Sequence, residues 1–260
     1  MIELNKIYNE DCLEGMKRIP DGSVDCIVCD LPYEVLNKGN EKAQWDNIIP
    51  MEPLFKEYWR IAKPNAPVIL FGQGMFTAQL MMAEPKNWRY NLIWQKDRPT
   101  GFLNAKRMPM RNHEDIAVFY RVLPTFNPQM HQGLPSKSRG NQCGKAKGNA
   151  CYGRYNIETY SKRTTTDKYP VSVIYFEKEK KQNMHPTQKP VALIQYLIRT
   201  YSNEGDTILD NCIGSGTTAI AAIREKRNFI GFETNKEYYD MACKRIQSEQ
   251  AQLTFAWIWK

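Results

Sequence analysis

The sequence is poor in the residues that most often hold metal ions. It contains only three histidines, and among its seven cysteines only Cys26 and Cys29 have the CxxC spacing, within an apolar run. Cys143 and Cys151 are separated by seven residues in a Gly- and Lys-rich stretch, and with so few histidines a zinc site is the weaker interpretation, so we predict no metal site. The odd cysteine count, in a chain too large to need cross-linking, predicts reduced thiols, and Cys26, Cys29 and Cys212 fall in apolar runs typical of a core.

Long hydrophobic runs are also missing. The longest, such as Val68 to Phe71, are far shorter than a membrane span, and the first twelve residues carry acids where a secretory signal needs an apolar stretch. Hydrophobic residues make up 42% and charged residues 25% of the chain, which argues against disorder, collagen and coiled coil. We therefore predict a soluble cytoplasmic protein that makes no contact with a membrane.

Acidic residues are scarce in one segment. The chain as a whole has 36 Lys and Arg against 28 Asp and Glu, a net charge of +8. Residues 124–170 hold eight of these bases but only two acids, Glu158 and Asp167, and show little periodicity. Such a segment favours a polyanionic partner, and the alternative is a solvated loop whose charge serves solubility.

The periodicity of apolar residues predicts the fold class. Apolar stretches of strand length alternate with amphipathic helical patterns, in which Leu54, Tyr58 and Ile61 share one face, Val191, Ile194, Ile198 and Tyr201 a second, and Tyr238, Ala242 and Ile246 a third. The strand-like stretches are residues 24–30, 67–72, 89–94, 115–120, 207–212 and 228–233. This alternation predicts an open α/β fold with a mostly parallel sheet, helices on both faces, and ligands at the carboxyl ends of the strands.

A glycine-rich run follows one predicted strand. Residues 210–218 read DNCIGSGTT, where Gly214 and Gly216 allow a sharp turn and close approach of a ligand, and Thr217 and Thr218 can cap the next helix. No Lys follows the last glycine, which excludes a phosphate-binding P-loop. Glu233 ends the next predicted strand, where a carboxylate can accept both hydroxyls of a ribose, so the two features together predict nucleoside binding.

Two further motifs contain side chains suited to binding a ligand or to catalysis. Asp30-Leu-Pro-Tyr33 ends the strand that begins at Val24, and it offers a carboxylate, a free carbonyl and an aromatic face to a planar ring with an exocyclic amine. The segment His185-Pro-Thr-Gln-Lys-Pro190 precedes an amphipathic helix, where Thr187 can cap and Pro190 fits the first turn. Lys189 opposes the helix dipole there, which indicates an anionic partner such as a carboxylate.

Taken in order, these motifs resemble the β group of S-adenosylmethionine-dependent amino-methyltransferases of DNA, a circularly permuted family. Asp30 to Tyr33 is similar to its (D/N/S)PP(Y/F/W) tetrapeptide, 210–218 to its DPFxGSGTT loop, and 185–190 is identical to its HPTQKP segment. Trp94-Gln-Lys96 and Asn112-His-Glu114 resemble later motifs of the catalytic half. This chain departs from the family at Leu31, which replaces the first proline, and at Asn211-Cys212-Ile213, which replaces Pro-Phe-x.

The resemblance implies a set of site residues. The catalytic residues would be Asp30, Leu31, Pro32 and Tyr33. Those that bind S-adenosylmethionine would be Asp11, Cys12, Asp30, His185, Thr187, Lys189, Asp210, Gly214, Ser215, Gly216, Thr217, Thr218 and Glu233. Residues 1–123 and 171–260 would form a Rossmann-like catalytic domain, with 124–170 inserted as a target-recognition module that binds DNA through Lys137, Arg139, Lys145, Lys147, Arg154, Lys162 and Arg163.

The implied reaction is methyl transfer to the N6 amine of an adenine flipped out of double-stranded DNA, since Asp at the first position of the tetrapeptide goes mainly with adenine in the family. Methylation of cytosine N4 is the alternative within the family. A nucleic-acid-binding relative without catalysis and an RNA methyltransferase are alternatives from other classes. The protein is expected to act as a monomer or homodimer, as part of restriction and modification in a bacterium or its phage.

Overall fold

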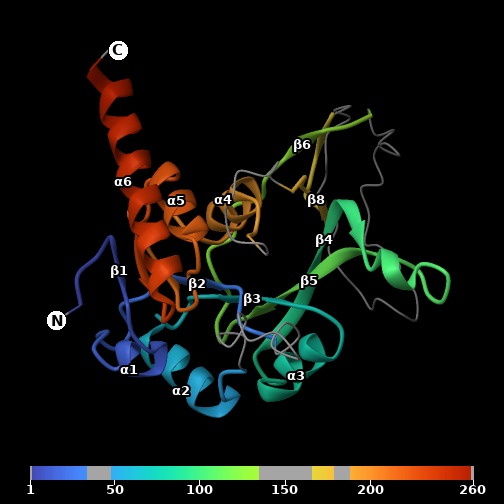
Figure 1. Ribbon diagram of the computed structural model, residues 1–260, viewed down its shortest axis with the longest axis horizontal. Helices are drawn as coiled ribbons and strands as arrows, with labels where there is room; N and C mark the ends of the chain where they lie inside the picture. The colour runs from blue at the N-terminus through green and yellow to red at the C-terminus, as the bar shows by residue number, and fades with distance from the viewer. Residues whose placement is uncertain (1, 34–47, 135–165, 179–187, 259–260) are drawn as a thin grey trace, which may run out of the picture. The chain divides into compact units, whose positions relative to one another are not determined.

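The computed structural model describes residues 2–33, 48–134, 166–178 and 188–258, with side chains to residue 252 (Figure 1). The chain divides into two compact units, Met1–Asn127 with Val171–Lys260, and Pro128–Pro170. The described part of the smaller unit is an antiparallel pair, β6 (His131–Gln132) and β7 (Asp167–Lys168). No helix within the described ranges is long and apolar enough to cross a bilayer.

The larger unit is built on one eight-stranded sheet in the order β1-β10-β9-β2-β3-β5-β4-β8. Its strands are β1 (Lys6–Tyr8), β2 (Cys26–Cys29), β3 (Val68–Gly72), β4 (Trp88–Thr100), β5 (Arg111–Phe119), β8 (Val173–Tyr175), β9 (Thr207–Asp210) and β10 (Asn228–Phe232). All neighbouring pairs are parallel except those that β5 makes with β3 and β4. The predicted α/β class with a mostly parallel sheet is confirmed.

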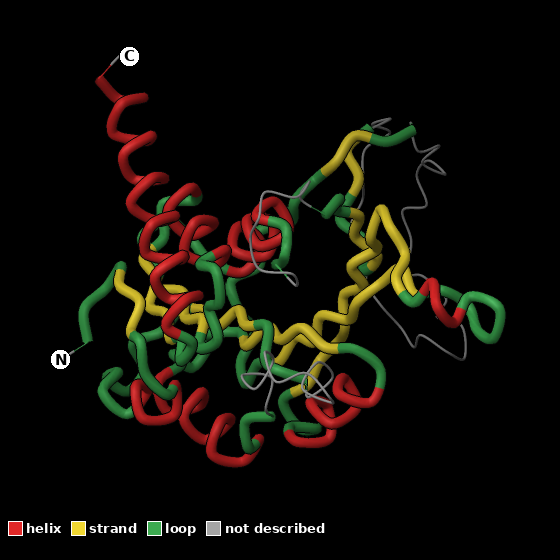
Figure 2. Tube along the Cα trace, in the orientation of Figure 1, coloured by secondary structure: helices red, strands yellow, loops and turns green. Residues whose placement is uncertain are grey.

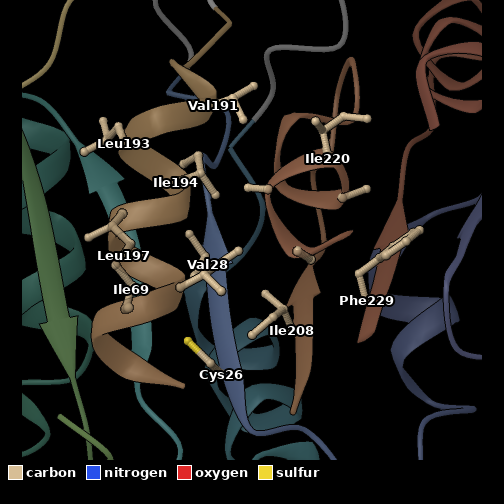
Figure 3. Close-up of a cluster of buried hydrophobic side chains, with 14 of the residues drawn as sticks. Cys26, Val28, Ile69, Val191, Leu193, Ile194, Leu197, Ile208, Ile220 and Phe229 are labelled. Carbon is tan, nitrogen blue, oxygen red and sulfur yellow. The ribbon is translucent and has the colours of Figure 1, made fainter. Parts of the chain in front are cut away.

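Helices cover both faces of this sheet (Figures 1 and 2). One face packs against α4 (Val191–Tyr201), α5 (Thr217–Arg224) and α6 (Lys236–Ile258), and the other against α1 (Cys12–Met16), α2 (Met51–Ile61) and α3 (Met75–Ala83). The central strand β2 is fully buried and shows the alternation this requires: Cys26 and Val28 face α4 (Figure 3), while Ile27 and Cys29 face α2.

Several element boundaries differ from the sequence prediction. β4 runs to Thr100 rather than stopping at 94, and β5 begins at Arg111 rather than 115. The added residues are mostly exposed and polar, so they lack the apolar pattern of a buried strand, and their pairing with each other holds them extended. The strands β1 and β8, of three residues each, were not predicted, nor was α3, whose residues are apolar without helical periodicity.

The predicted helix caps were also wrong in two places. Gly216 is the N-cap of α5 and no side chain caps it, so Thr217 and Thr218 are its first residues rather than its caps. Pro190 is the N-cap of α4, which places Lys189 before the helix and not in its first turn. In both cases the residue before the helix adopts a non-helical conformation that the sequence pattern did not reveal.

The topology creates a crevice in the middle of the sheet. β9 leads through α5 to β10 on one side, and β2 leads through α2 to β3 on the other, although β9 and β2 are neighbours. The chain therefore leaves the carboxyl ends of these two strands in opposite directions. In open α/β sheets this switch point is where ligands bind, and the residues that follow the two strands are Asp30 and Asn211.

Close packing of α5 against α6 depends on one glycine. Gly216 has a φ of +84°, and a Cβ added to it would lie 3.0 Å from the Cβ of Ala242 on α6. Gly205, with a φ of +86°, is a natural control, because a Cβ there would meet nothing within 4 Å. The two sites share the backbone conformation and differ in the available space.

We therefore predict that Gly205→Ala lowers the free energy of unfolding by about 1 kcal/mol, the cost of the left-handed conformation for alanine. Gly216→Ala should cost about 2–3 kcal/mol, because steric crowding against Ala242 adds to the same conformational cost. Urea unfolding followed by circular dichroism without cofactor measures both. Equal losses in the two variants would show that the contact with Ala242 relaxes freely.

Candidate functional site

A cavity of about 780 Å³ opens at the carboxyl edge of the sheet, over the switch point. This volume is in the range of small-molecule sites. Most of the residues predicted from the sequence line it: Asp11, Cys12, Asp30, Leu31, Pro32, Tyr33, Lys189, Asp210, Gly214, Ser215, Thr217, Thr218 and Glu233. The structure thus brings the three sequence motifs together around one space, although they are up to two hundred residues apart in the chain.

The carboxylate of Asp30 stands at the end of β2 and is held from two sides. The hydroxyl of Tyr33 donates to Oδ1 at 2.5 Å, and the ammonium of Lys189 donates to Oδ2 at 2.5 Å. Each carboxylate oxygen has a second lone pair, so Asp30 can still accept hydrogen bonds from a ligand. Leu31, which replaces the family proline, is buried in the core under this loop and anchors it by packing.

Lys189 belongs to a buried row of alternating charges. Besides Asp30, its Nζ lies 3.3 Å from Oε2 of Glu114, and the other oxygen of Glu114 accepts a hydrogen bond from Lys96. Burial alone would lower the pKa of Lys189, but the carboxylates of Asp30 and Glu114 outweigh it and raise the pKa above its ordinary value. The row therefore runs Asp30, Lys189, Glu114, Lys96, with each charge next to an opposite one.

Burial and neighbouring charges also compete in setting the pKa values of the other two buried members of this row, Glu114 and Lys96. Burial would raise the pKa of Glu114, yet Lys189 and Lys96 hold it below its ordinary value. Burial lowers the pKa of Lys96, and the nearby Glu114 offsets this only in part. A buried charge destabilises the fold unless an opposite charge pairs with it. Each member of the row therefore needs its neighbours in order to stay charged.

On the other side of the cavity, Glu233 follows β10 and joins two loops. Its Oε2 accepts from the backbone N–H of Gly214 at 2.9 Å, and its Oε1 accepts from that of Asn235 at 2.7 Å. Burial raises the pKa of Glu233, against the effect of these N–H donors. Gly214 has a φ of +52°, and a Cβ there would meet nothing within 4 Å, which leaves its backbone open to a ligand in the cavity.

The rest of the glycine-rich loop is fixed by its own side chains. Asp210 is buried and accepts from Thr218 Oγ1 at 2.5 Å and from the N–H of Cys212 at 3.1 Å, while burial raises its pKa to about 6. Ser215 contacts Gln188 at 3.2 Å, and its carbonyl accepts from Arg245 of α6 at 2.6 Å. These contacts fix the conformation of the loop, and Asp210 contributes to it through its hydrogen bonds to Thr218 and Cys212.

Asp11 and Cys12, also predicted to bind the cofactor, have structural partners as well. Asp11 caps α1, since its Oδ1 accepts from the N–H groups of Leu13 and Glu14. Cys12 is buried and its sulfur accepts from the amide of Asn211 at 3.4 Å, and that amide's oxygen accepts from Tyr58 of α2 at 2.5 Å. Asn211, the first of the residues that replace Pro-Phe in the family loop, is therefore buried at the wall of the cavity and held there by these contacts.

Some predicted residues fall outside the described ranges. These are His185, Thr187 and the basic residues Lys137, Arg139, Lys145, Lys147, Arg154, Lys162 and Arg163, so their roles stay predictions. Conversely, Lys96 and Glu114 sit in motifs noted from the sequence, but no role was assigned to them. In the described parts of the chain, no three His, Cys, Asp or Glu side chains are grouped as metal ligands.

The cavity suits a nucleoside that also carries a charged amino-acid part. Its walls combine the aromatic residues Phe71, Trp94 and Phe232 with the carboxylates of Asp11, Asp30 and Glu233. Gly214 presents an open backbone beside Glu233, the arrangement that allows close approach of a ribose. S-adenosylmethionine has these parts, so the residues present fit it.

Comparison with known proteins agrees with this geometry. A family model described as DNA methylase, of the N6 and N4 type, matches residues 24–244. The type II methyltransferase M.HpaI of Haemophilus parainfluenzae is 27% identical over 94% of this chain and 74% of its own, and M2.DpnII of Streptococcus pneumoniae is 28% identical over 94% and 90%. The M1.HpyAVI–SAM complex has a TM-score of 0.60 at 26% identity, covering 92% of this chain and 98% of that one.

The resemblance inferred from the motifs is thereby confirmed over most of the chain. The family match spans β2 to α6, and so includes the tetrapeptide, the glycine-rich loop and Glu233. The chain belongs to the DNA methylase family, the β-group amino-methyltransferases that use S-adenosylmethionine to methylate adenine N6 or cytosine N4 in DNA.

Proposed function

We propose that this protein methylates the N6 amine of adenine in double-stranded DNA, with the target base flipped into the cavity. The observation that carries the proposal is the placement of Asp30 and Glu233 on the walls of one cavity. Glu233 and Gly214 bind the nucleoside part of the cofactor, and Asp30 receives the base. Because a base inside a duplex cannot reach a recessed site of this kind, the base has to leave the stack.

Asp30 and its neighbours orient the target amine. The carboxylate of Asp30 and the carbonyl of Leu31 accept the two amine hydrogens, which directs the nitrogen lone pair toward the cofactor, and Tyr33 stacks on the ring. When bound, S-adenosylmethionine supplies an electrophilic methyl group on a sulfonium. Holding the amine in line with that group lowers the barrier mainly by positioning.

We assign Lys189 to Asp30 rather than to the carboxylate of the cofactor. The sequence indicated an anionic partner, and the carboxylates of Asp30 and Glu114 lie 2.5 and 3.3 Å from the Lys189 ammonium, which supports this assignment. With Tyr33 donating to its other oxygen, Asp30 has one orientation fixed before any substrate arrives. The carboxylate therefore meets the amine without having to reorganise.

The proton balance needs no base before the methyl is transferred. A neutral amine attacks through its lone pair, and the methylated nitrogen then carries a positive charge and becomes acidic. Asp30 stabilises that charge as it develops and accepts the proton or passes it to water.

Two parts of the proposal rest on the sequence alone. Asp at the first position of the tetrapeptide favours adenine over cytosine, as in the family that the motifs resemble. The basic residues of the inserted segment, Lys137, Arg139, Lys145, Lys147, Arg154, Lys162 and Arg163, are assigned to DNA binding and target choice, with arginines reading base edges and lysines meeting phosphates.

The reaction is tested by incubating the protein with unmethylated genomic DNA and isotope-labelled S-adenosylmethionine. Mass spectrometry of the digested nucleosides should reveal labelled N6-methyladenine, and sequencing of the modified DNA should give the target site. Labelled N4-methylcytosine as the sole product would refute the choice of adenine. RNA offered in parallel should remain unlabelled.

Asp30→Ala should reduce kcat by about 10²–10³-fold and leave the Kd for S-adenosylmethionine within a factor of about two, because the carboxylate is assigned to the amine. The matched control is Asp25→Ala at the amino end of the same strand. Asp25 accepts from Lys63 and from the N–H of Thr207, away from the cavity, so its loss should lower stability and spare kcat. Near-normal turnover of Asp30→Ala would overturn the assignment.

Lys189→Met separates the two possible partners of this lysine. If Lys189 positions Asp30, kcat should fall at least 10-fold while the Kd for S-adenosylmethionine, measured by isothermal titration calorimetry, changes little. A Kd raised more than 10-fold with kcat preserved would show instead that the partner of Lys189 is the carboxylate of the cofactor. The double variant Lys189→Met with Asp30→Ala should turn over no more slowly than Asp30→Ala alone.

A further inference from the structure

We propose that the turn between β4 and β5 is an arm that grips DNA beside the target base and inserts an apolar tip into the duplex. The arm comprises residues 97–113. The inference rests on the proposed function, because it names the partner surface next to the same cavity, and it concerns a part of the chain separate from the basic inserted segment.

The arm begins and ends at the rim of the cavity. Lys96 and Thr100 on the outgoing strand and Glu114 on the returning strand all line it. A second hollow of about 650 Å³, which shares Lys96 with the first, continues along the base of the arm between Pro99 and Met110. In Figure 1 the turn projects beyond the end of the sheet. The arm therefore starts next to the place where a duplex would deliver a base to the cavity.

The tip of the arm is ordered and carries bare apolar side chains. Gly101 has a φ of +91° and starts a 3₁₀ turn, and the N–H groups of Arg107 and Met108 both bond to the carbonyl of Asn104. On this framework Phe102 is 80% exposed and Leu103 is 97% exposed, with Met108 and Met110 also exposed. An ordered loop with apolar side chains held in solvent is typical of a binding element.

Basic residues surround these apolar side chains. Arg98, Lys106, Arg107 and Arg111 lie in the arm, against one acid, Asp97, which pairs with Arg98 and accepts from the N–H of Lys178. Lys106, Arg107 and Arg111 have side chains without an ion pair or hydrogen bond to any residue that the structure describes. Their charge is therefore available to a partner.

The combination selects DNA over a second copy of the chain. A symmetric dimer through this surface would bring the same positive charges of both copies together, which costs energy. Phosphates complement them, and Phe, Leu and Met are the side chains that proteins insert between base steps to unstack them. A wedge on an arm that starts at the rim of such a cavity can fill the gap that the flipped base leaves.

Two variants test the arm, each with a matched control. Lys106→Ala with Arg107→Ala removes charge, and Lys56→Ala, an exposed lysine on α2, is its control. Phe102→Ser with Leu103→Ser removes the wedge, and Met82→Ser on α3 is its control, because Met82 is exposed to a similar degree, 75%. All should bind S-adenosylmethionine as the wild type does, since none of the four arm positions lines the cavity.

Binding of a duplex between low and moderate salt reports the charges. The slope of log affinity against log salt should decrease in magnitude by about 1.8 in the Lys106 and Arg107 variant, at about 0.9 per phosphate contact. An unchanged slope would overturn the contact. This measurement needs no methyl transfer, so it stands even if the wild type binds DNA but fails to methylate it, a result that would refute the proposed function alone.

Single-turnover methylation of the mapped site reports the wedge. The Phe102 and Leu103 variant should be at least 10-fold slower on a fully paired duplex and recover to within about 3-fold when the target base is mispaired, because a mispaired base flips more easily. Equal defects on both duplexes, or none, would overturn the wedge. A loss of dimer mass in light scattering, with DNA binding unchanged, would assign the arm to a second copy instead.

Discussion

The site depends on the ion pair between Lys189 and Asp30. It joins the segment before α4 to the end of the central strand across 159 residues of sequence, with Lys189 buried and Asp30 partly exposed to the cavity. Two charges in such surroundings are tolerated only together, and here Glu114 and Lys96 extend the pairing to β5 and β4. One row of charges therefore ties three strands and a helix start to Asp30, the group that we propose meets the substrate.

The two halves of the cavity are organised by different forces. On the target side, charge pairing sets the orientation of Asp30 and of its neighbours. On the cofactor side, backbone hydrogen bonds set the geometry. Glu233 accepts from the N–H groups of Gly214 and Asn235, and so holds the glycine-rich loop and the loop after β10 together. This division suits the two ligands of the proposed reaction, since we propose that the cofactor is bound by close approach of the backbone and the base by a directed carboxylate.

Sequence reasoning found the fold and most of the cavity wall for one reason: these features are local. Strand-length apolar runs, the turn at Gly214 and the acid at the end of β10 are each visible within about ten residues. The strands β2 and β10 run parallel to each other in the sheet, so Asp30 and Glu233 at their carboxyl ends had to lie along the same edge.

What the sequence concealed is the pairing between distant residues. Lys189 was expected to need an anion, but nothing local to it points to Asp30 or Glu114. The outer parts of β4 and β5 could not be predicted for the same reason. Their residues are extended because the two strands pair with each other, and they carry no apolar pattern that would indicate a strand. Asp11 and Asp210 were recognised as site residues, yet their hydrogen bonds serve α1 and the glycine-rich loop.

The order of strands in the sheet also governs how the protein folds during synthesis. β2 is the middle of the sheet, but Ile208 of β9, which pairs with Cys26, follows it by 182 residues. At roughly 5–20 residues per second, one edge of this apolar strand stays unpaired for about ten to forty seconds after it leaves the ribosome. The order of the chain thus leaves the strand that ends at Asp30 exposed to wrong partners until the half with the glycine-rich loop is synthesised.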